Sequence, residues 1–137
     1  HSNPLIAHVA SLEAAVALTK EFPAPLLELA NRFWPGPLTL LVEKSSIVPD
    51  TVTAGSSKVA IRIPSHLHTQ ALLQHLSFPL VAPSANPYTR ISPTTAEHVA
   101  YYFGSSIPLI LDGGPCTLGL ESTIIGFENN TPVLDFL

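Results

Sequence analysis

The stretch "RFWPGPLTLLVEK", Arg32 to Lys44, decides the fold because it joins a helix to a strand through a four-residue break. Before the break, apolar residues recur at helical spacing and predict an amphipathic helix over residues 24–34, namely Leu26, Leu27, Ala30 and Trp34. The two prolines and the glycine of "WPGP" cannot continue that helix. "LTLLVEK" then has the pattern of a strand. Such alternation of helix and strand is typical of an α/β domain.

The same alternation extends in both directions along the chain. Strands are predicted at 4–10, 38–44, 58–64, 78–82, 107–114, 122–127 and 132–136, and the strand at 78–82 is expected to be buried. Helices are predicted at 11–22, with Ser11 as the N-cap, and at 66–76. A further helix is predicted at 94–103, where Thr94 and Glu97 form a capping box. Residues 45–57 are expected to be a loop with local turns. Because no helix separates the last two strands, which should form a hairpin, we expect a mixed sheet of parallel and antiparallel strands.

Composition excludes several classes of protein. The 137 residues suffice for one domain with a single core, and only 12% of them are charged. With a formal net charge of −4, the chain has no general attraction to phosphate backbones, so any anion site must be local. Cys116 is the only cysteine, which favours a reducing compartment. Without a signal peptide or a long apolar run, we expect a soluble, cytoplasmic protein with no membrane contact.

Metal binding and nucleophilic catalysis find little support. The six histidines show no ligand spacing, so no protein metal site is expected. His8 lies inside an apolar strand, where it is either a hydrogen-bonded core residue or a ligand contact. Ser84 lacks a nucleophile elbow, and no recognisable surround identifies Cys116 as a thiolate.

Two features favour a small anionic ligand such as a nucleotide. "LDGGPCTLGLEST", residues 111–123, combines glycines with hydroxyl residues that can donate to phosphate, although a generic glycine-rich turn explains it equally well. In "KVAIRIP", Lys58 and Arg62 alternate onto one strand face, about 13 Å apart, with Val59, Ile61 and Ile63 on the other. A solvated strand face is the alternative for that pair of cations.

Several stretches in order resemble the YrdC-like family, the L-threonylcarbamoyladenylate synthases: "NPLIAHV", "RFWPGPLTLLV", "VAIRIPSH", "APSAN" followed by "SPTTAEHV", "DGGPCTLGLESTII" and "PVL". The resemblance implies one YrdC-like domain over residues 1–137, with a twisted α/β sheet around a concave, positively charged cavity. It also implies a nucleotidyltransferase that makes threonylcarbamoyl-AMP and pyrophosphate from L-threonine, bicarbonate and ATP. Mg²⁺ would accompany the ATP. The product would serve t6A modification of tRNA, with tRNA an indirect partner through other proteins of that pathway.

Family roles transfer to matching positions of this chain. The L-threonine-binding residues implied are His8, Arg62, Ala82 (by its backbone) and Ser122, and the ATP-binding residues implied are Lys58, Ser84, Asn86 and Ser92. The resemblance assigns no catalytic side chain. At the position of Lys58 the family more usually has a small hydroxyl residue.

The start of the chain departs from the family. Family members have a strand and then a Lys-x-Arg motif before "NPLI", and this sequence starts after that point, at His1. A polypeptide that truly begins there is expected to fold poorly or to be inactive. Two other functions stay open: an RNA-binding or regulatory YrdC-like module, and a carbamoyl-transfer domain of the hydrogenase-maturation type.

Overall fold

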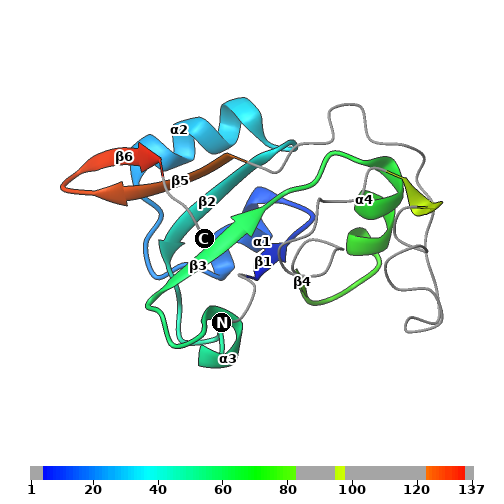
Figure 1. Cartoon of the computed structure of the whole chain (residues 1–137), viewed down its shortest axis with the longest axis horizontal. Helices are drawn as coiled ribbons and strands as arrows, with labels where there is room; N and C mark the ends of the chain where they lie inside the picture. Colours follow the sequence, from blue (N-terminus) through cyan, green and yellow to red (C-terminus); the bar gives the residue numbers. More distant parts are fainter. Residues whose placement is uncertain (1–4, 83–94, 98–122, 135–137) are drawn as a thin grey trace. The chain divides into compact units, whose positions relative to one another are not determined.

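The computed structural model describes residues 5–82, 95–97 and 123–134 (Figure 1). By its contacts the chain divides into two compact units, residues 1–82 with 122–137 and residues 83–121. All the helices and strands below belong to the first unit. The predicted strand at 107–114 and the capping residue Thr94 lie outside the described residues.

Within the described residues, six strands form one sheet in the order β4-β1-β3-β2-β5-β6 (Figure 1). Their bounds are β1 Ile6–His8, β2 Leu38–Glu43, β3 Lys58–Arg62, β4 Leu80–Ala82, β5 Thr123–Glu128 and β6 Thr131–Leu134. The β1–β3 and β2–β5 pairs are parallel, and the other three pairs are antiparallel. The predicted mixed sheet is therefore confirmed.

The described part of this unit also contains four helices, which lie between its strands in the sequence: α1 Leu12–Ala17, α2 Ala24–Phe33, α3 Asp50–Thr53 and α4 Leu67–Gln74. Ser11 is the N-cap of α1, as predicted, and its hydroxyl accepts a hydrogen bond from the Ala14 N–H at 3.2 Å. The helix ends earlier than predicted, because Thr19 instead pairs with Lys44 in an isolated antiparallel bridge. The segment predicted as a loop at 45–57 contains the single turn of α3.

The predicted break after α2 is confirmed. Residues Trp34–Pro37 form a turn, called the WPGP turn below, between α2 and β2. The Trp34 indole Nε1 donates to the carbonyl of Leu38 at 2.7 Å, and its ring meets Phe22 edge-on with centroids 6.3 Å apart. The turn is therefore held to the strand that follows it and to the loop before α2.

One face of the sheet forms the core with α1 and α2. Buried sheet residues include Val9 of the β1 end, Leu40 of β2 and Ile61 of β3, and they cluster with Ala15 of α1 and Leu26 of α2. The predicted alternation along β3 is confirmed, with Val59, Ile61 and Ile63 all in this cluster. The neighbour Ala60, on the other face, is also buried.

A strand is present within residues 78–82, as β4, but the prediction that it is buried was wrong. β4 is the outermost strand of the described sheet, bonded to β1 alone, and Val81 is 37% exposed. An apolar run of this length cannot by itself distinguish an edge strand from a central one.

The predicted hairpin near the end of the chain is confirmed. β5 and β6 pair antiparallel around Asn129 and Asn130, which have φ of 51° and 62°. Positive φ at both central residues is the arrangement that a tight two-residue hairpin requires, and asparagine tolerates it better than most residues.

None of the helices in the described ranges combines the length and the apolar character that crossing a bilayer would take.

Candidate functional site

His8 and Arg62 lie side by side on the face of the sheet opposite the core. In the parallel β1–β3 ladder His8 pairs with Arg62, which implies a Cα separation of about 4.8 Å. Their strand neighbours Ala7 and Ile61 point the other way, into the core. The sheet therefore presents an imidazole and a guanidinium together, although they are 54 positions apart in the sequence (62 − 8).

Two more predicted residues share this face, farther along the strands. Ala82 of β4 pairs with Ile6, two residues before His8. Lys58 lies at the other end of β3 from Arg62, with the buried Ala60 between them. The structure thus places His8 beside Arg62, sets Ala82 on the other side of β1, and sets Lys58 about 13 Å from Arg62.

The Arg62 side chain is held by the WPGP turn. Its Nε donates to the carbonyl oxygen of Gly36 at 2.9 Å, in a half-buried setting. The N–H of the same glycine donates to the carbonyl of Ile63, also at 2.9 Å. An arginine guanidinium remains charged at every physiological pH, so this bond orients a permanent cation.

The surroundings of His8 lower its pKa and so favour its neutral form. Burial lowers the pKa of His8 below 6.5, and the Arg62 guanidinium lowers it further, while hydrogen bonds with the backbone of Leu80 and Ile6 oppose the shift. At neutral pH the pair is therefore one cation beside one neutral imidazole. A neutral imidazole has one donor and one acceptor nitrogen, and it adds no second positive charge.

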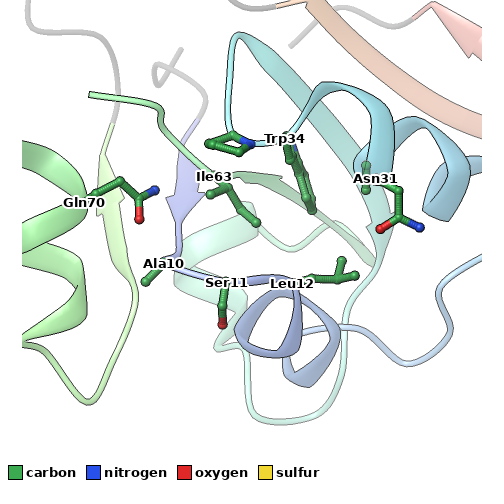
Figure 2. Close-up of a pocket in the computed structure, with 9 residues that line it drawn as sticks. Ala10, Ser11, Leu12, Asn31, Trp34, Ile63 and Gln70 are labelled. Carbon is green, nitrogen blue, oxygen red and sulfur yellow. The ribbon is translucent and has the colours of Figure 1, made fainter. Parts of the chain in front are cut away.

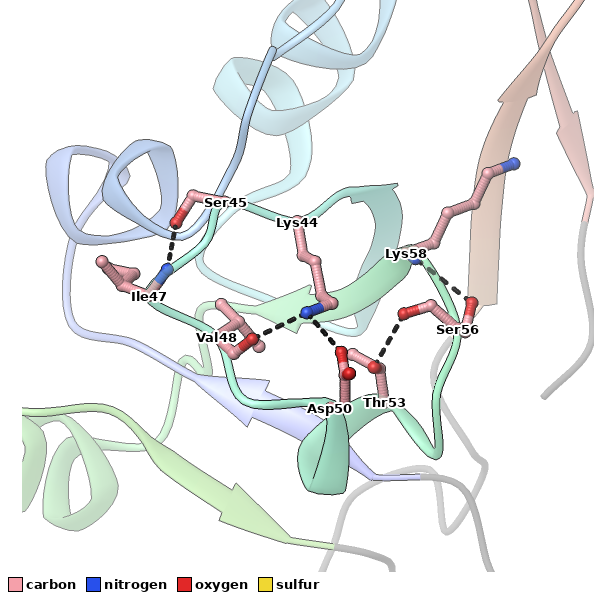
Figure 3. Close-up of polar contacts among 8 residues, drawn as sticks. All are labelled: Lys44, Ser45, Ile47, Val48, Asp50, Thr53, Ser56 and Lys58. Atoms are coloured by element: carbon pink, nitrogen blue, oxygen red, sulfur yellow. Dashed lines mark hydrogen bonds and ion pairs between the residues drawn. The ribbon is translucent and has the colours of Figure 1, made fainter.

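Lys58 is separate from the other lysine near this end of the sheet. Lys44 Nζ donates to the Val48 carbonyl at 2.8 Å and pairs with Asp50 at 2.9 Å, which holds the loop before α3 (Figure 3). The Lys58 side chain extends away from that cluster (Figure 3). Within the described part of the chain, its Nζ forms no ion pair or hydrogen bond, so its charge is available to a ligand.

The end of β3 is held from two sides. The WPGP turn contacts it at Arg62 and Ile63, and the Gln70 side-chain amide of α4 donates to the carbonyl of Pro64. Figure 2 shows Trp34 and Gln70 on opposite sides of Ile63, around a cavity of about 240 Å³. This cavity borders the core side of the strand and contains neither His8 nor Arg62.

Sequence reasoning missed two residues of this site. Gly36 was interpreted only as part of a helix break, yet it binds Arg62 through its carbonyl. Thr39 is fully buried, and extending the β2–β3 register by one residue places it opposite Arg62. The sequence pattern that could have pointed to Gly36 is a glycine between two prolines. The only pattern that could have pointed to Thr39 is a polar residue in an apolar strand.

The other predicted site residues are not described. Ser84, Asn86, Ser92 and Ser122 lie outside the described residues, as does the glycine-rich stretch 111–121. Among the residues that are described, no group of three or more His, Cys, Asp or Glu side chains could hold a metal ion.

Comparison with known proteins connects this chain to one family. The Sua5/YciO/YrdC family model, described as "Telomere recombination", matches residues 1–134. A threonylcarbamoyl-AMP synthase of Pyrococcus abyssi is 47% identical over 132 residues, and one of Bacillus subtilis is 44% identical over 133 residues. Each match covers 96% of this chain but only 39% and 38% of the relative.

A solved structure agrees with the sequence comparison. The crystal structure of P. abyssi Sua5 complexed with L-threonine matches with a TM-score of 0.91 at 47% identity, covering 96% of this chain and 39% of that one. The chain therefore spans about two fifths of the length of these relatives.

Proposed function

Because the chain belongs to the Sua5/YciO/YrdC family, we propose that it carries the substrate site of an L-threonylcarbamoyladenylate synthase. The proposed reaction converts L-threonine, bicarbonate and ATP into threonylcarbamoyl-AMP, pyrophosphate and water. The observation that carries the proposal is the His8–Arg62 pair on the face of the sheet opposite the core, with the arginine Nε bonded to the Gly36 carbonyl.

The pair suits an amino acid as ligand. Arg62 would bind the threonine carboxylate, since a guanidinium offers parallel donors to a carboxylate's two oxygens. Neutral His8, one strand away, would contact the same molecule through its donor or its acceptor nitrogen. The backbone of Ala82 and the hydroxyl of Ser122 would complete the threonine site, in keeping with the family resemblance.

ATP would lie farther along the sheet. Lys58 is proposed to contact its phosphates, together with Ser84, Asn86 and Ser92. Mg²⁺ is proposed to arrive with the ATP, because this ion keeps several waters and is commonly bound through substrate phosphates. The described residues offer no carboxylate cage for it, so no protein ligand is proposed and the ion belongs to the substrate.

Positioning would supply most of the catalysis. The threonine amine and bicarbonate combine to a carbamate with loss of water. A carbamate oxygen then attacks the α-phosphorus of ATP, and the bond from that phosphorus to the pyrophosphate oxygen breaks. Holding both reactants in place and balancing charge on the phosphates require no covalent intermediate with the protein.

The wider setting is proposed on the same ground. The product would supply the threonylcarbamoyl group for t6A in tRNA, in the cytoplasm. Because the chain carries a formal net charge of −4, we propose that tRNA is reached through other proteins of the pathway rather than bound directly.

The test is calorimetric titration of L-threonine into the protein and into Arg62→Ala. A hydrogen bond to a charged group contributes about 1.5–3 kcal/mol. Threonine affinity should therefore fall roughly 10- to 150-fold, while affinity for a non-hydrolysable ATP analogue changes little. Arg32→Ala is the matched control, because Arg32 is an exposed arginine in the last turn of α2. It should leave both affinities unchanged.

Pyrophosphate release provides the second readout. Release should require threonine, bicarbonate, ATP and Mg²⁺ together. Unchanged threonine affinity in Arg62→Ala would remove the arginine from the site. Tight tRNA binding at about 150 mM salt, without pyrophosphate release, would instead favour an RNA-binding module.

A further inference from the structure

Gly36 bonds to the end of β3 with both of its backbone polar groups. Its N–H donates to the Ile63 carbonyl, and its carbonyl accepts from Arg62 Nε, each at 2.9 Å. Gly36 thus holds both the backbone of Ile63 and the side chain of the preceding residue, Arg62. The position of the Arg62 guanidinium is tied to the position of this turn.

The WPGP turn is itself firmly held. Trp34 closes α2 through its N–H to the Ala30 carbonyl at 2.9 Å and reaches forward through its indole N–H to Leu38. Its ring packs against Phe22 and borders the cavity beside Ile63 (Figure 2). A turn with contacts on both sides provides a fixed acceptor for Arg62.

Only glycine allows the turn to come this close to α2. A Cβ added to Gly36 would lie 2.6 Å from the carbonyl oxygen of Phe33, the last residue of the helix. The obstacle is backbone rather than a flexible side chain, so the turn itself would have to move. The carbonyl that accepts from Arg62 would move with it.

Fixing the Nε side of a guanidinium orients the plane of the whole group. A free arginine side chain loses rotamer freedom when a ligand immobilises it, and this costs affinity. An arginine that is already oriented avoids most of that cost.

We propose that Gly36 is a positioning residue for ligand binding: its carbonyl orients Arg62 before the ligand's carboxylate arrives. The inference rests on the proposed function, in which Arg62 binds that carboxylate. It assigns to the WPGP turn a role in affinity for the amino acid, in addition to ending a helix.

The experiment is a double-mutant cycle between Gly36→Ala and Arg62→Lys, read by calorimetric titration of L-threonine and, separately, of a non-hydrolysable ATP analogue. Gly36→Ala alone should weaken threonine binding about three- to tenfold, the range expected for immobilising one arginine. Affinity for the ATP analogue should change less than about twofold. A lysine at position 62 has no Nε–H group in the guanidinium geometry, so Gly36→Ala should add little to the effect of Arg62→Lys.

Gly55→Ala is the matched control. Gly55 has φ of 84° and open space around its missing Cβ, so alanine strains the backbone there without a clash. This variant should lower the melting temperature and leave threonine affinity unchanged. If it weakens threonine binding as much as Gly36→Ala does, the effect is one of general stability and the proposal is wrong.

Other outcomes separate the inference from the function beneath it. An equal loss from Gly36→Ala with arginine or lysine at position 62, or no loss at all, overturns the positioning role. If Arg62→Ala in the same series leaves threonine affinity unchanged, the proposed threonine site fails instead. Should Gly36→Ala not fold, Trp34→Phe removes the indole bond to Leu38 and should give a smaller loss with the same dependence on Arg62.

Discussion

Leu40→Ala should destabilise the protein by about 3–4 kcal/mol, whereas Leu41→Ala should cost only about 1 kcal/mol. Leu40 is 0% exposed, in the middle of β2, and belongs to the core cluster. Alanine there leaves a cavity bounded by β3, β5 and the helices. Leu41 points to the opposite face and is only half-buried.

The magnitude follows from this burial. A fully buried Leu→Ala change costs 2–5 kcal/mol in general, since lost transfer free energy and a residual cavity add together. The upper half of that range applies because β2 is bonded on both sides, to β3 and to β5, and cannot easily close the gap. A half-buried leucine loses roughly half the transfer free energy and leaves no enclosed void.

Urea unfolding followed by circular dichroism measures both variants. With a slope of about 2 kcal/mol per molar urea, Leu40→Ala should lower the midpoint by about 1.5–2 M and Leu41→Ala by about 0.5 M. Equal costs, or a greater cost for Leu41→Ala, would refute the assignment of the two faces. A one-residue shift of register exchanges the faces of a strand, so His8 and Arg62 would then no longer share the face opposite the core.

Three further outcomes are expected from substitutions of ionisable groups. The pKa of His8 is lower in the folded chain than its ordinary 6.5, so protonation of His8 favours unfolding. The free energy of unfolding should therefore fall as the pH decreases from about 7 through 6.5 toward that lowered pKa. His8→Asn should lose that part of the slope in urea titrations between about pH 5 and 7.5, and an identical slope in both proteins would contradict the shift. Lys44→Met should cost about 1–2 kcal/mol, because it strips the Val48 carbonyl of its donor. Asp50→Asn should leave the urea midpoint nearly unchanged, since Asp50 is 80% exposed. A large loss of stability in Asp50→Asn would show that the Lys44–Asp50 ion pair matters more than the bond from Lys44 to the Val48 carbonyl.

Local patterns of the sequence identified most of the secondary structure in the described region. Ser11 as N-cap, the end of α2 at the WPGP turn and the alternation along β3 depend on neighbouring residues, so each could be predicted without knowing the rest of the chain. The end of α1 and the exposure of β4 could not, because both depend on partners far away in sequence. Thr19 pairs with Lys44, and among the described strands β4 is bonded to β1 alone.

The candidate site divides in the same way. The sequence by itself determined that Lys58 and Arg62 share a strand face, because the side-chain period of a strand is two. It also determined that His8 needs a polar partner, because it lies in an apolar strand. Only the tertiary structure decided that His8 lies beside Arg62 and that the Gly36 carbonyl accepts a hydrogen bond from the guanidinium. Strand order and register bring these groups together, and they are settled by packing across the whole sheet, which no local pattern encodes.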